Sequence, residues 1–350
     1  MKRSLLILLL AISFLPGHAQ TGKAKNLVKE GVELHDQGKY EDAIKKYDEA
    51  IAADESFFDA YYEKAYSLYA MKKLDECIDL SKKIIKQFPD EPSLKGVYVH
   101  YGSALDDQGK SAAAIKVYNE GLKKFPGYFL LSFNKGITYS GMNDADKAYA
   151  SYKDALINNP FHTSSYYRVA EMLRSTNRIP AILACVMHLV LEPTSDRSPV
   201  SFSMLKQLVY GNVKKTGENS VTITMNVDML DTKKSKNKED NFGLQEMMFD
   251  MSSALDKDSV MSSLAKTDIE KFDLRFQMLI NGLSSDNKGF FSERYVPFFK
   301  SLKDNNYTMV VSRLVFKNTN DEANAAWLKV NTNKTAEFYE WLEAYKWPEK

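Results

Sequence analysis

The chain has 350 residues, with 47 basic and 46 acidic side chains, and 44% of its residues are hydrophobic. This length predicts two domains or one long repeat array, and the apolar content is enough to build a packed core. The near-neutral charge argues against a nucleic acid partner, because phosphate binding requires a basic excess.

Residues 1–19 have the pattern of a secretory signal peptide. Two basic residues at positions 2 and 3 precede an apolar run from Leu5 to Leu15, which ends at Pro16. A mainly apolar run of eleven residues is too short to span a bilayer. We therefore expect cleavage after Ala19 and export to the periplasm or out of the cell. The mature chain would be soluble, with a net charge of −1, since no later apolar segment reaches spanning length.

From residue 24 the chain repeats itself about every 34 residues, in units near 24–57, 58–91, 95–128, 129–162 and 163–196. Each unit carries a small residue followed three positions later by a large one, as closely packed helices require. The small residues are Gly31, Ala65, Gly102, Gly136 and Ala170, and the large ones are Leu34, Leu68, Leu105, Tyr139 and Leu173. Left-handed turns are predicted after the first helix of a unit, at Gly38, Gly109, Asn143 and Asn177. A Pro near the end of a unit stops its second helix.

This pattern resembles the tetratricopeptide repeat (TPR) family. In the first unit Leu27, Gly31, Leu34, Ala43, Tyr47 and Ala50 stand at the family's offsets, although Glu55 replaces the terminal Pro. In the fourth unit Gly136, Tyr139, Ala148, Tyr152, Ala155 and Pro160 do so. The resemblance covers residues 24–196 and implies a mainly all-α fold, an α-solenoid of about five helix pairs. It also implies that the first helices line a concave groove for a protein or peptide.

Beyond the repeats the helical period returns. Residues 197–214 predict one amphipathic helix that could cover the end of the array, with Leu205 and Leu208 on its apolar face. Residues 215–350 predict a mostly helical C-terminal domain, in which Leu244, Met247, Met248, Met251 and Leu255 share one apolar face. Its aromatic run at 289–299 resembles the C-terminal region of some exported bacterial TPR proteins, which implies no known activity.

One short β-hairpin is compatible with the C-terminal domain. Alternating apolar residues from Val221 to Met229 predict a strand. Its candidate partner is the segment 307–316, which could equally be a buried helix. We predict a loop at 214–220 and a charged linker at 231–241.

No segment carries a recognisable catalytic constellation, so we expect a protein that is not an enzyme and that needs no cofactor. The triplet Gly109-Lys110-Ser111 resembles the end of a phosphate-binding loop, but Ala104 stands where that motif needs another Gly. The methionines between positions 225 and 261 could hold Cu(I) through their sulfur atoms, yet filling a core is the simpler interpretation.

The two cysteines predict neither a disulfide nor a metal site. Cys77 and Cys185 lie three repeats apart in an array that contacts only neighbours, so we expect two buried, unpaired thiols. Cys185 and His188 have metal-like spacing, but no second pair of ligands lies nearby in the sequence.

The resemblance places seven apolar residues on the concave groove: Val28, Tyr62, Tyr66, Tyr69, Phe133, Ile137 and Tyr167. An exposed apolar surface of this kind marks a binding site or a buried interface. We expect either a separate protein or peptide there, in a scaffold of the bacterial envelope, or the chain's own C-terminal domain. The alternative from another class is an enzyme or small-ligand-binding protein, with its site near Glu293, Arg294 and Tyr295.

Overall fold

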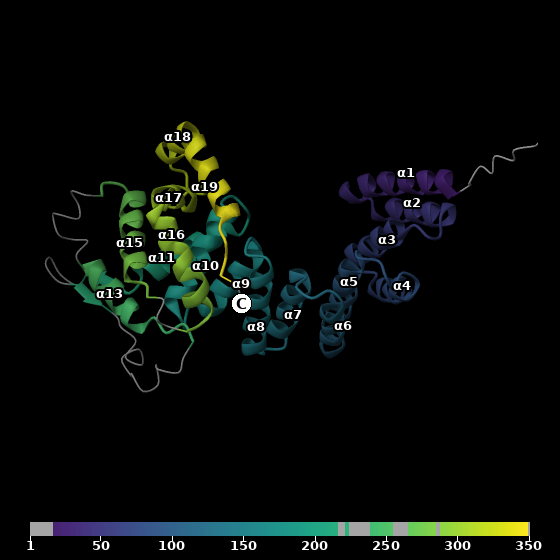
Figure 1. Cartoon of the computed structure of the whole chain (residues 1–350), viewed down its shortest axis with the longest axis horizontal. Coiled ribbons are helices and arrows are strands. Elements are labelled where there is room, and N and C mark those ends of the chain that lie inside the picture. The colour runs from purple at the N-terminus through teal and green to yellow at the C-terminus, as the bar shows by residue number, and fades with distance from the viewer. Residues whose placement is uncertain (1–16, 216–220, 224–238, 255–264, 285–287, 349–350) are drawn as a thin grey trace, which may run out of the picture. The chain divides into compact units, whose positions relative to one another are not determined.

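The computed structural model describes residues 17–215, 221–223, 239–254, 265–284 and 288–348. The chain divides into two compact units, Met1–Asp144 and Ala145–Lys350. The predicted all-α fold is confirmed, and its paired helices are visible in Figure 1. Most of the predicted signal peptide lies outside the described residues, and Gly17 begins the first helix.

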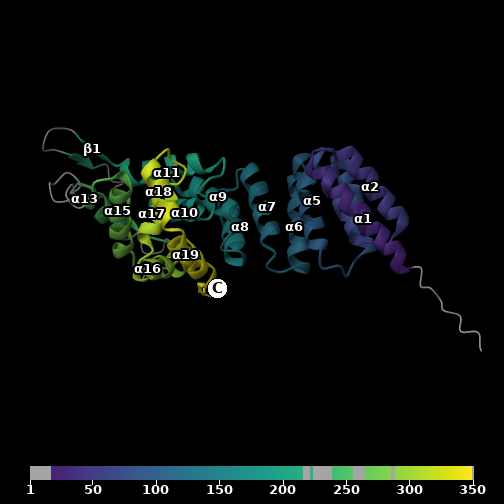
Figure 2. The same ribbon diagram turned by 90° about the horizontal axis from the view of Figure 1, so that it is seen from above.

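The first unit consists of consecutive helices joined by short turns. They are α1 (Gly17–Asp36), α2 (Tyr40–Ala53), α3 (Phe58–Ala70), α4 (Leu74–Gln87), α5 (Leu94–Asp107), α6 (Ser111–Lys124) and α7 (Phe129–Gly141). Figure 2 shows α1 beside α2 and α5 beside α6. The first helices α1, α3, α5 and α7 also contact one another in sequence order, so they form one layer.

The turns inside the first four helix pairs adopt the left-handed conformation. Gly38 and Gly109 have φ values of 75°, and Asn143 has 59°, as the sequence predicts. Lys72 occupies the same place in the second repeat with a φ of 58°, where the sequence carries no signal for such a turn. A lysine in this conformation carries a steric cost that a glycine avoids.

The predicted small residues allow the two helices of a pair to approach closely. A Cβ atom on Gly31 would lie 2.4 Å from the Tyr47 ring, and one on Gly102 would lie 2.3 Å from the Tyr118 ring. Neither ring could keep its position beside a larger residue. Gly31 and Gly102 are therefore required by packing.

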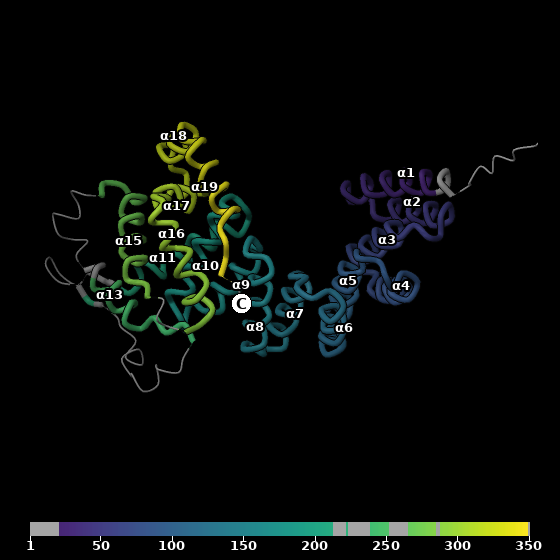
Figure 3. The backbone as a smooth tube through the Cα atoms, viewed as in Figure 1, coloured from purple at the N-terminus to yellow at the C-terminus, as the bar shows by residue number. Residues whose placement is uncertain are grey.

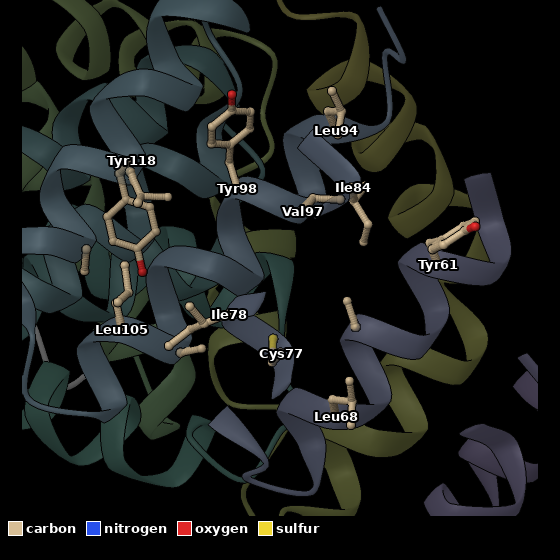
Figure 4. Close-up of a cluster of buried hydrophobic side chains, with 14 of the residues drawn as sticks. Tyr61, Leu68, Cys77, Ile78, Ile84, Leu94, Val97, Tyr98, Leu105 and Tyr118 are labelled. Atoms are coloured by element: carbon tan, nitrogen blue, oxygen red, sulfur yellow. The ribbon is translucent and has the colours of Figure 1, made fainter. Parts of the chain in front are cut away.

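Cys77 lies inside the main core of the first unit. Figure 4 shows it among buried apolar side chains that include Leu68 and Ile78. It is fully buried, as are Ala43 and Ala114 at the same position of their repeats. Burial raises the pKa of the Cys77 thiol to about 11, so this thiol is a small hydrophobe at neutral pH.

The second unit begins with three helices of the repeat array. They are α8 (Ala145–Asn158), α9 (Thr163–Leu173) and α10 (Arg178–Leu191), followed by α11 (Ser198–Tyr210). The described C-terminal elements are β1 (Val213–Lys215), β2 (Val221–Ile223), α13 (Gly243–Ala254), α15 (Asp268–Gly282), the π-helix η3 (Phe291–Tyr295), α16 (Val296–Asp304), α17 (Thr308–Val315), α18 (Glu322–Val330) and α19 (Thr332–Ala344). After α19 the chain continues as an extended segment, drawn in yellow in Figure 3.

Proline stops the second helix of each later repeat. Pro89, Pro126, Pro160 and Pro193 each lie two positions beyond the last residue of α4, α6, α8 and α10. Proline cannot continue a helix at that position, because it lacks the backbone N–H and clashes with the preceding turn. This prediction is confirmed.

The predicted strand has a different partner from the one suggested by the sequence. Residues Val221–Ile223 pair in antiparallel fashion with Val213–Lys215. The prediction of a loop from 214 is therefore wrong for Lys214 and Lys215, and the rest of the predicted strand lies outside the described residues. Segment 307–316 contains α17, whose apolar residues Val310, Val311, Leu314 and Val315 are all buried. That helix contacts both α10 and α15, which explains why it is apolar on two sides.

The fifth repeat departs from the others at its turn and in its second helix. Asn177 has a φ of −151°, so the predicted left-handed turn is wrong here. Its side-chain amide instead donates a hydrogen bond to the carbonyl oxygen of Asp240, at 3.0 Å. Every residue of α10 except Leu191 is buried, because α9, α11 and α17 pack around it. The end of the array is thus enclosed within the second unit.

Helix α13 buries the opposite face from the one that its sequence predicts. Leu244, Met248 and Met251 are exposed, whereas Glu246 and Asp250 are buried. Asp250 Oδ1 accepts a hydrogen bond from Arg178 Nη1 at 2.5 Å, and Glu246 accepts one from the Arg178 backbone N–H at 3.1 Å. A buried guanidinium needs a carboxylate partner, so Arg178 turns the acidic face of α13 inward. The core-filling interpretation is wrong for these two methionines.

Candidate functional site

Three aromatic rings from successive first helices stack on one another in the first unit. The Tyr66 ring of α3 lies 4.7 Å from the His35 ring of α1, with an angle of 24° between the planes. On its other side it lies 5.0 Å from the His100 ring of α5, at 26°. These distances and angles are typical of stacked aromatic pairs. The rings therefore cross three repeats without interruption.

Two more tyrosines of α3 flank this arrangement. Tyr62, Tyr66 and Tyr69 follow a helical spacing, so they share one face of α3. The rings of Tyr62 and Tyr69 lie 5.4 and 6.1 Å from the His100 ring. Gly96 leaves room for Tyr62, because a Cβ there would lie 2.7 Å from the Tyr62 ring. We call His35, Tyr62, Tyr66, Tyr69 and His100 the ring stack.

Three members of the ring stack are held uncharged by burial, and Tyr66 is its exposed member. Burial lowers the pKa of His100 to about 4 and raises the pKa of Tyr62 and of Tyr69 to about 12. None of these three side chains is charged near neutral pH. Tyr66 is 40% exposed, whereas Tyr62 and Tyr69 are half-buried. A neutral aromatic surface is suited to hydrophobic and cation–π contacts.

Three carboxylates lie beside the ring stack. Asp59 and Glu63 share the face of α3 that carries Tyr62 and Tyr66, by helical spacing. Asp36 follows His35 at the end of α1. Burial, and then the negative charges of Asp59 and Asp36, raise the pKa of Glu63. We call Asp36, Asp59 and Glu63 the acidic group.

The other predicted groove residues are placed differently. Val28 is buried in the core of the first helix pair. Phe133 and Ile137 are half-buried on α7. Tyr167 lies on α9 in the second unit, where the Arg197 guanidinium lies 5.6 Å from the centre of its ring. The structure brings Tyr62, Tyr66 and Tyr69 together, because the rings of all three contact the ring of His100.

Sequence reasoning missed His100 as a member of the site and did not connect His35 with the tyrosines. The repeat register places His35 on the groove surface without a partner, and it places Val99 and Ser103, not His100, on that surface in the third repeat. The sequence does contain a signal for these rings. Each of the helices α1, α3 and α5 carries an aromatic or imidazole ring in its middle or second half. Their stacking depends on the distance between repeats, which the sequence does not provide.

Three stretches of the first unit match models of known families. Models described as TPR repeat and tetratricopeptide repeat match residues 31–72, 59–91 and 96–123. This is a TPR protein. The matched residues extend from α1 to α6 and include the whole ring stack. TPR arrays serve in protein–protein interaction and scaffolding, through the extended surfaces that stacked repeats create.

Solved structures similar to the TPR protein include other TPR proteins. One from Thermus thermophilus shares 21% identity over 52% of this chain and 98% of its own, with a TM-score of 0.45. PilF from Pseudomonas aeruginosa shares 14% sequence identity over 74% of this chain and 99% of its own chain, with a TM-score of 0.48. YrrB is described as a TPR protein with an unusual peptide-binding site. It shares 16% sequence identity over 52% of this chain and 93% of its own chain, with a TM-score of 0.36. No curated protein sequence matches the chain.

The alternative site near Arg294 is filled by internal contacts. The Tyr295 hydroxyl lies 2.9 Å from the Tyr166 hydroxyl, and its ring packs against Phe290, Phe291 and Trp347. Arg294 donates hydrogen bonds to the carbonyl oxygens of Pro348 and Ile157, at 2.7 and 3.3 Å. These polar groups hold the C-terminal segment in place, and the rings around them leave the site closely packed.

The remaining sequence candidates are either hydrogen-bonded or buried within the fold. The Ser111 hydroxyl, in the triplet that resembles a phosphate loop, donates to Asp106 Oδ1 at 2.6 Å. Cys185 and His188 are fully buried within α10, and burial lowers the pKa of His188 to about 4. Within the described ranges, no three or more His, Cys, Asp or Glu side chains are arranged to hold a metal ion. Nor does any helix in those ranges combine the length and apolar character needed to cross a bilayer.

Proposed function

We propose that this TPR protein is a non-catalytic interaction module that binds an extended segment of another protein across α1, α3 and α5. The observation that supports this is Tyr66, whose ring is held between two imidazoles and is still 40% exposed. Tyr66 is the only aromatic residue among the large exposed apolar side chains of the described residues, whereas the other exposed group, on α13, consists of the flexible side chains of Leu244, Met248 and Met251. The ring stack is the surface on which a partner would gain most.

The physical reason is preorganisation. A free tyrosine side chain loses conformational entropy when a partner immobilises it, which weakens binding. Stacking on His35 and His100 has already fixed the Tyr66 ring. Aromatic residues are enriched among the few interface residues that carry most of the binding energy. Tyr66 combines this residue type with a fixed position.

The test is a selection from a displayed library of random peptides, with the mature chain (20–350) as bait. Peptides enriched on the native chain should lose about tenfold or more in affinity for Tyr66→Ala. Tyr101→Ala is the matched control, because Tyr101 lies on α5 in the same layer and packs against the core. If the peptides bind Tyr66→Ala as tightly as they bind the native chain, the binding surface lies elsewhere.

The competing occupant is the chain's own C-terminal domain. Nitration of tyrosines in the intact mature chain with tetranitromethane separates the two cases. If the surface is open, Tyr66 should be nitrated before the half-buried Tyr62 and Tyr69. Protection of Tyr66 in the intact chain would show that the protein covers its own ring stack, and would contradict binding of a separate partner there.

We also infer that the protein acts in the bacterial envelope or outside the cell. The support is the basic start, the short apolar run and the break at Pro16. N-terminal sequencing of the protein recovered from a bacterial host's periplasm or medium should begin at Gln20. A chain that retains Met1 and stays in the cytoplasm would contradict export and leave the proposed interaction role unchanged.

A further inference from the structure

Among the described residues, the acidic group has no cation partner, although neighbouring carboxylates do. Asp48 pairs with Lys64 at 2.6 Å, and Glu30 pairs with Lys46 at 2.9 Å. For Asp36, Asp59 and Glu63, the described part of the chain provides no ion pair within 4.0 Å. The negative charge beside the ring stack is therefore uncompensated there, and a partner's positive charge would be attracted to it.

The first unit itself contains an example of the contact that such a partner would make. Lys72 Nζ lies 5.1 Å from the centre of the Tyr69 ring and 2.7 Å from Asp107 Oδ2. One tyrosine and one carboxylate thus hold an ammonium group at the edge of the ring stack. Tyr66 lies on the same helix as Tyr69, and Glu63 precedes Tyr66 by three residues on that helix. These two residues offer an external ammonium group the same pair of contacts.

The exposure of the residues fits this role. Asp36 and Asp59 are exposed and Glu63 is half-buried, so the carboxylates can be reached from solvent. A cation over an aromatic ring gains about 0.5–1 kcal/mol at an exposed site and more when water is removed. An extended peptide that carries several cations can contact the ring and the carboxylates together.

We propose that the ring stack and the acidic group select partner segments rich in Lys or Arg, with one cation seated over Tyr66 and paired with Glu63. This inference rests on the proposed function and specifies the chemistry of the partner. It assigns Tyr66 to the cation–π contact, Glu63 to the ion pair, and Asp36 and Asp59 to longer-range attraction.

The experiment measures fluorescence anisotropy of three labelled peptides of about twelve residues with the mature chain. The three peptides have the same Ser and Leu residues and differ only at every third position. That position is Lys in the first peptide, Gln in the second and Glu in the third. We expect the Lys peptide to bind about tenfold or more tightly than the Gln peptide, and the Glu peptide to bind most weakly. Raising the salt concentration should weaken the binding of the Lys peptide.

Four variants assign the contacts. Tyr66→Ala and Glu63→Gln should each weaken Lys-peptide binding several-fold, whereas Tyr66→Phe should retain it because the ring remains. Glu120→Gln is the matched control, since Glu120 is an exposed glutamate on the second helix α6. Equal effects of Glu63→Gln and Glu120→Gln would indicate non-specific attraction and overturn the proposal.

The outcomes separate this inference from the proposed function. If the Gln or Glu peptide binds as tightly as the Lys peptide and depends on Tyr66, the selectivity is refuted and the binding surface stands. If no peptide from this set or from the random library depends on Tyr66, both proposals fail.

Discussion

Two second helices of the repeats, one from each unit, are used in different ways. In the first unit, α2 buries Ala43, Tyr47 and Ala50 and leaves its charged residues in solvent. In the second unit, α10 is apolar around its whole circumference and is buried on all sides. A repeat unit thus specifies a helix pair, whereas the outer residues of the second helix decide whether other elements cover it.

The largest effect is expected where a charge is buried to join α10 to α13. Arg178→Met leaves Asp250 and Glu246 buried without their cation, which should cost about 3–5 kcal/mol in unfolding free energy. The three tryptophans, Trp327, Trp341 and Trp347, all lie in the second unit, so tryptophan fluorescence reports its unfolding in urea.

The control for this prediction has two parts. Arg178→Met with Asp250→Leu should recover part of the lost stability, because one of the unpaired carboxylates is removed. Hydrogen exchange of α1 to α6 should stay unchanged in the single variant. Loss of protection in those helices would show that the two units do not unfold separately.

A smaller effect tests the same comparison at equivalent positions of two second helices. Leu183 in α10 aligns with Asp79 in α4, which is exposed and pairs with Lys82 at 3.2 Å. Leu183→Ala should cost about 2–5 kcal/mol, because it leaves a cavity in a fully buried helix. Asp79→Ala should change stability by less than about 0.5 kcal/mol. Similar values for the two variants in thermal unfolding would remove the distinction between the helices.

Close packing within the first unit gives the next prediction. Gly102→Ala should lower stability by about 1–3 kcal/mol, because its Cβ would lie 2.3 Å from a Tyr118 ring carbon. Helix propensity alone predicts the opposite sign, a gain of about 1 kcal/mol. Gly141→Ala is the control, since nothing lies within 4 Å of its Cβ. A stabilised Gly102→Ala variant in chemical denaturation would show that the helices can move apart.

The smallest predicted effect is a pH dependence that differs between the units. Burial lowers the pKa of His100 to about 4, so protonation favours the unfolded chain. The stability that depends on a neutral His100 is fully present above about pH 6.5, and it is lost as the pH falls towards 4. His100→Phe should therefore reduce the pH dependence of hydrogen exchange in α5 by an amount on the order of 1–2 kcal/mol.

The second unit contains groups with opposite effects. Burial lowers the pKa of His162 and of His188 to about 4, so protonation of these two groups also disfavours the folded state. Burial raises the pKa of Asp240, Glu246 and Asp273, whose protonation favours the folded state as the pH falls through their pKa values. We expect these carboxyls to offset part of the histidine effect. A pH dependence of hydrogen exchange as large as that of two unopposed buried histidines would contradict this balance.

The features that the sequence could predict are those that depend on near neighbours. The turn at Gly38, the packing of Gly31 on Tyr47 and the proline after α4 each involve residues within one helix pair, so most repeats show such features independently. The covering of α10 could be suspected only from its apolar composition, since the elements that cover it come from far along the chain.

The failures have a common physical origin in contacts between distant segments. The acidic face of α13 is buried because Arg178 requires it, and Arg178 lies 72 positions before Asp250. The sequence left segment 307–316 open between a strand and a buried helix, and the structure shows the helix α17 in contact with α10 and α15. The ring stack was found only in part, since Tyr62, Tyr66 and Tyr69 follow a helical period whereas His100 joins them across repeats.

The enclosure of α10 also limits how the protein can change in length. Tyr339 of α19 donates a hydrogen bond to the Val190 carbonyl oxygen at 2.8 Å, and α11 and α17 cover other sides of the same helix. A duplicated repeat added after α10 would have no free surface on which to stack. Repeats inserted among α1 to α6 would meet only other repeats. Gene duplication, in nature or in the laboratory, can therefore lengthen this array from within its N-terminal half.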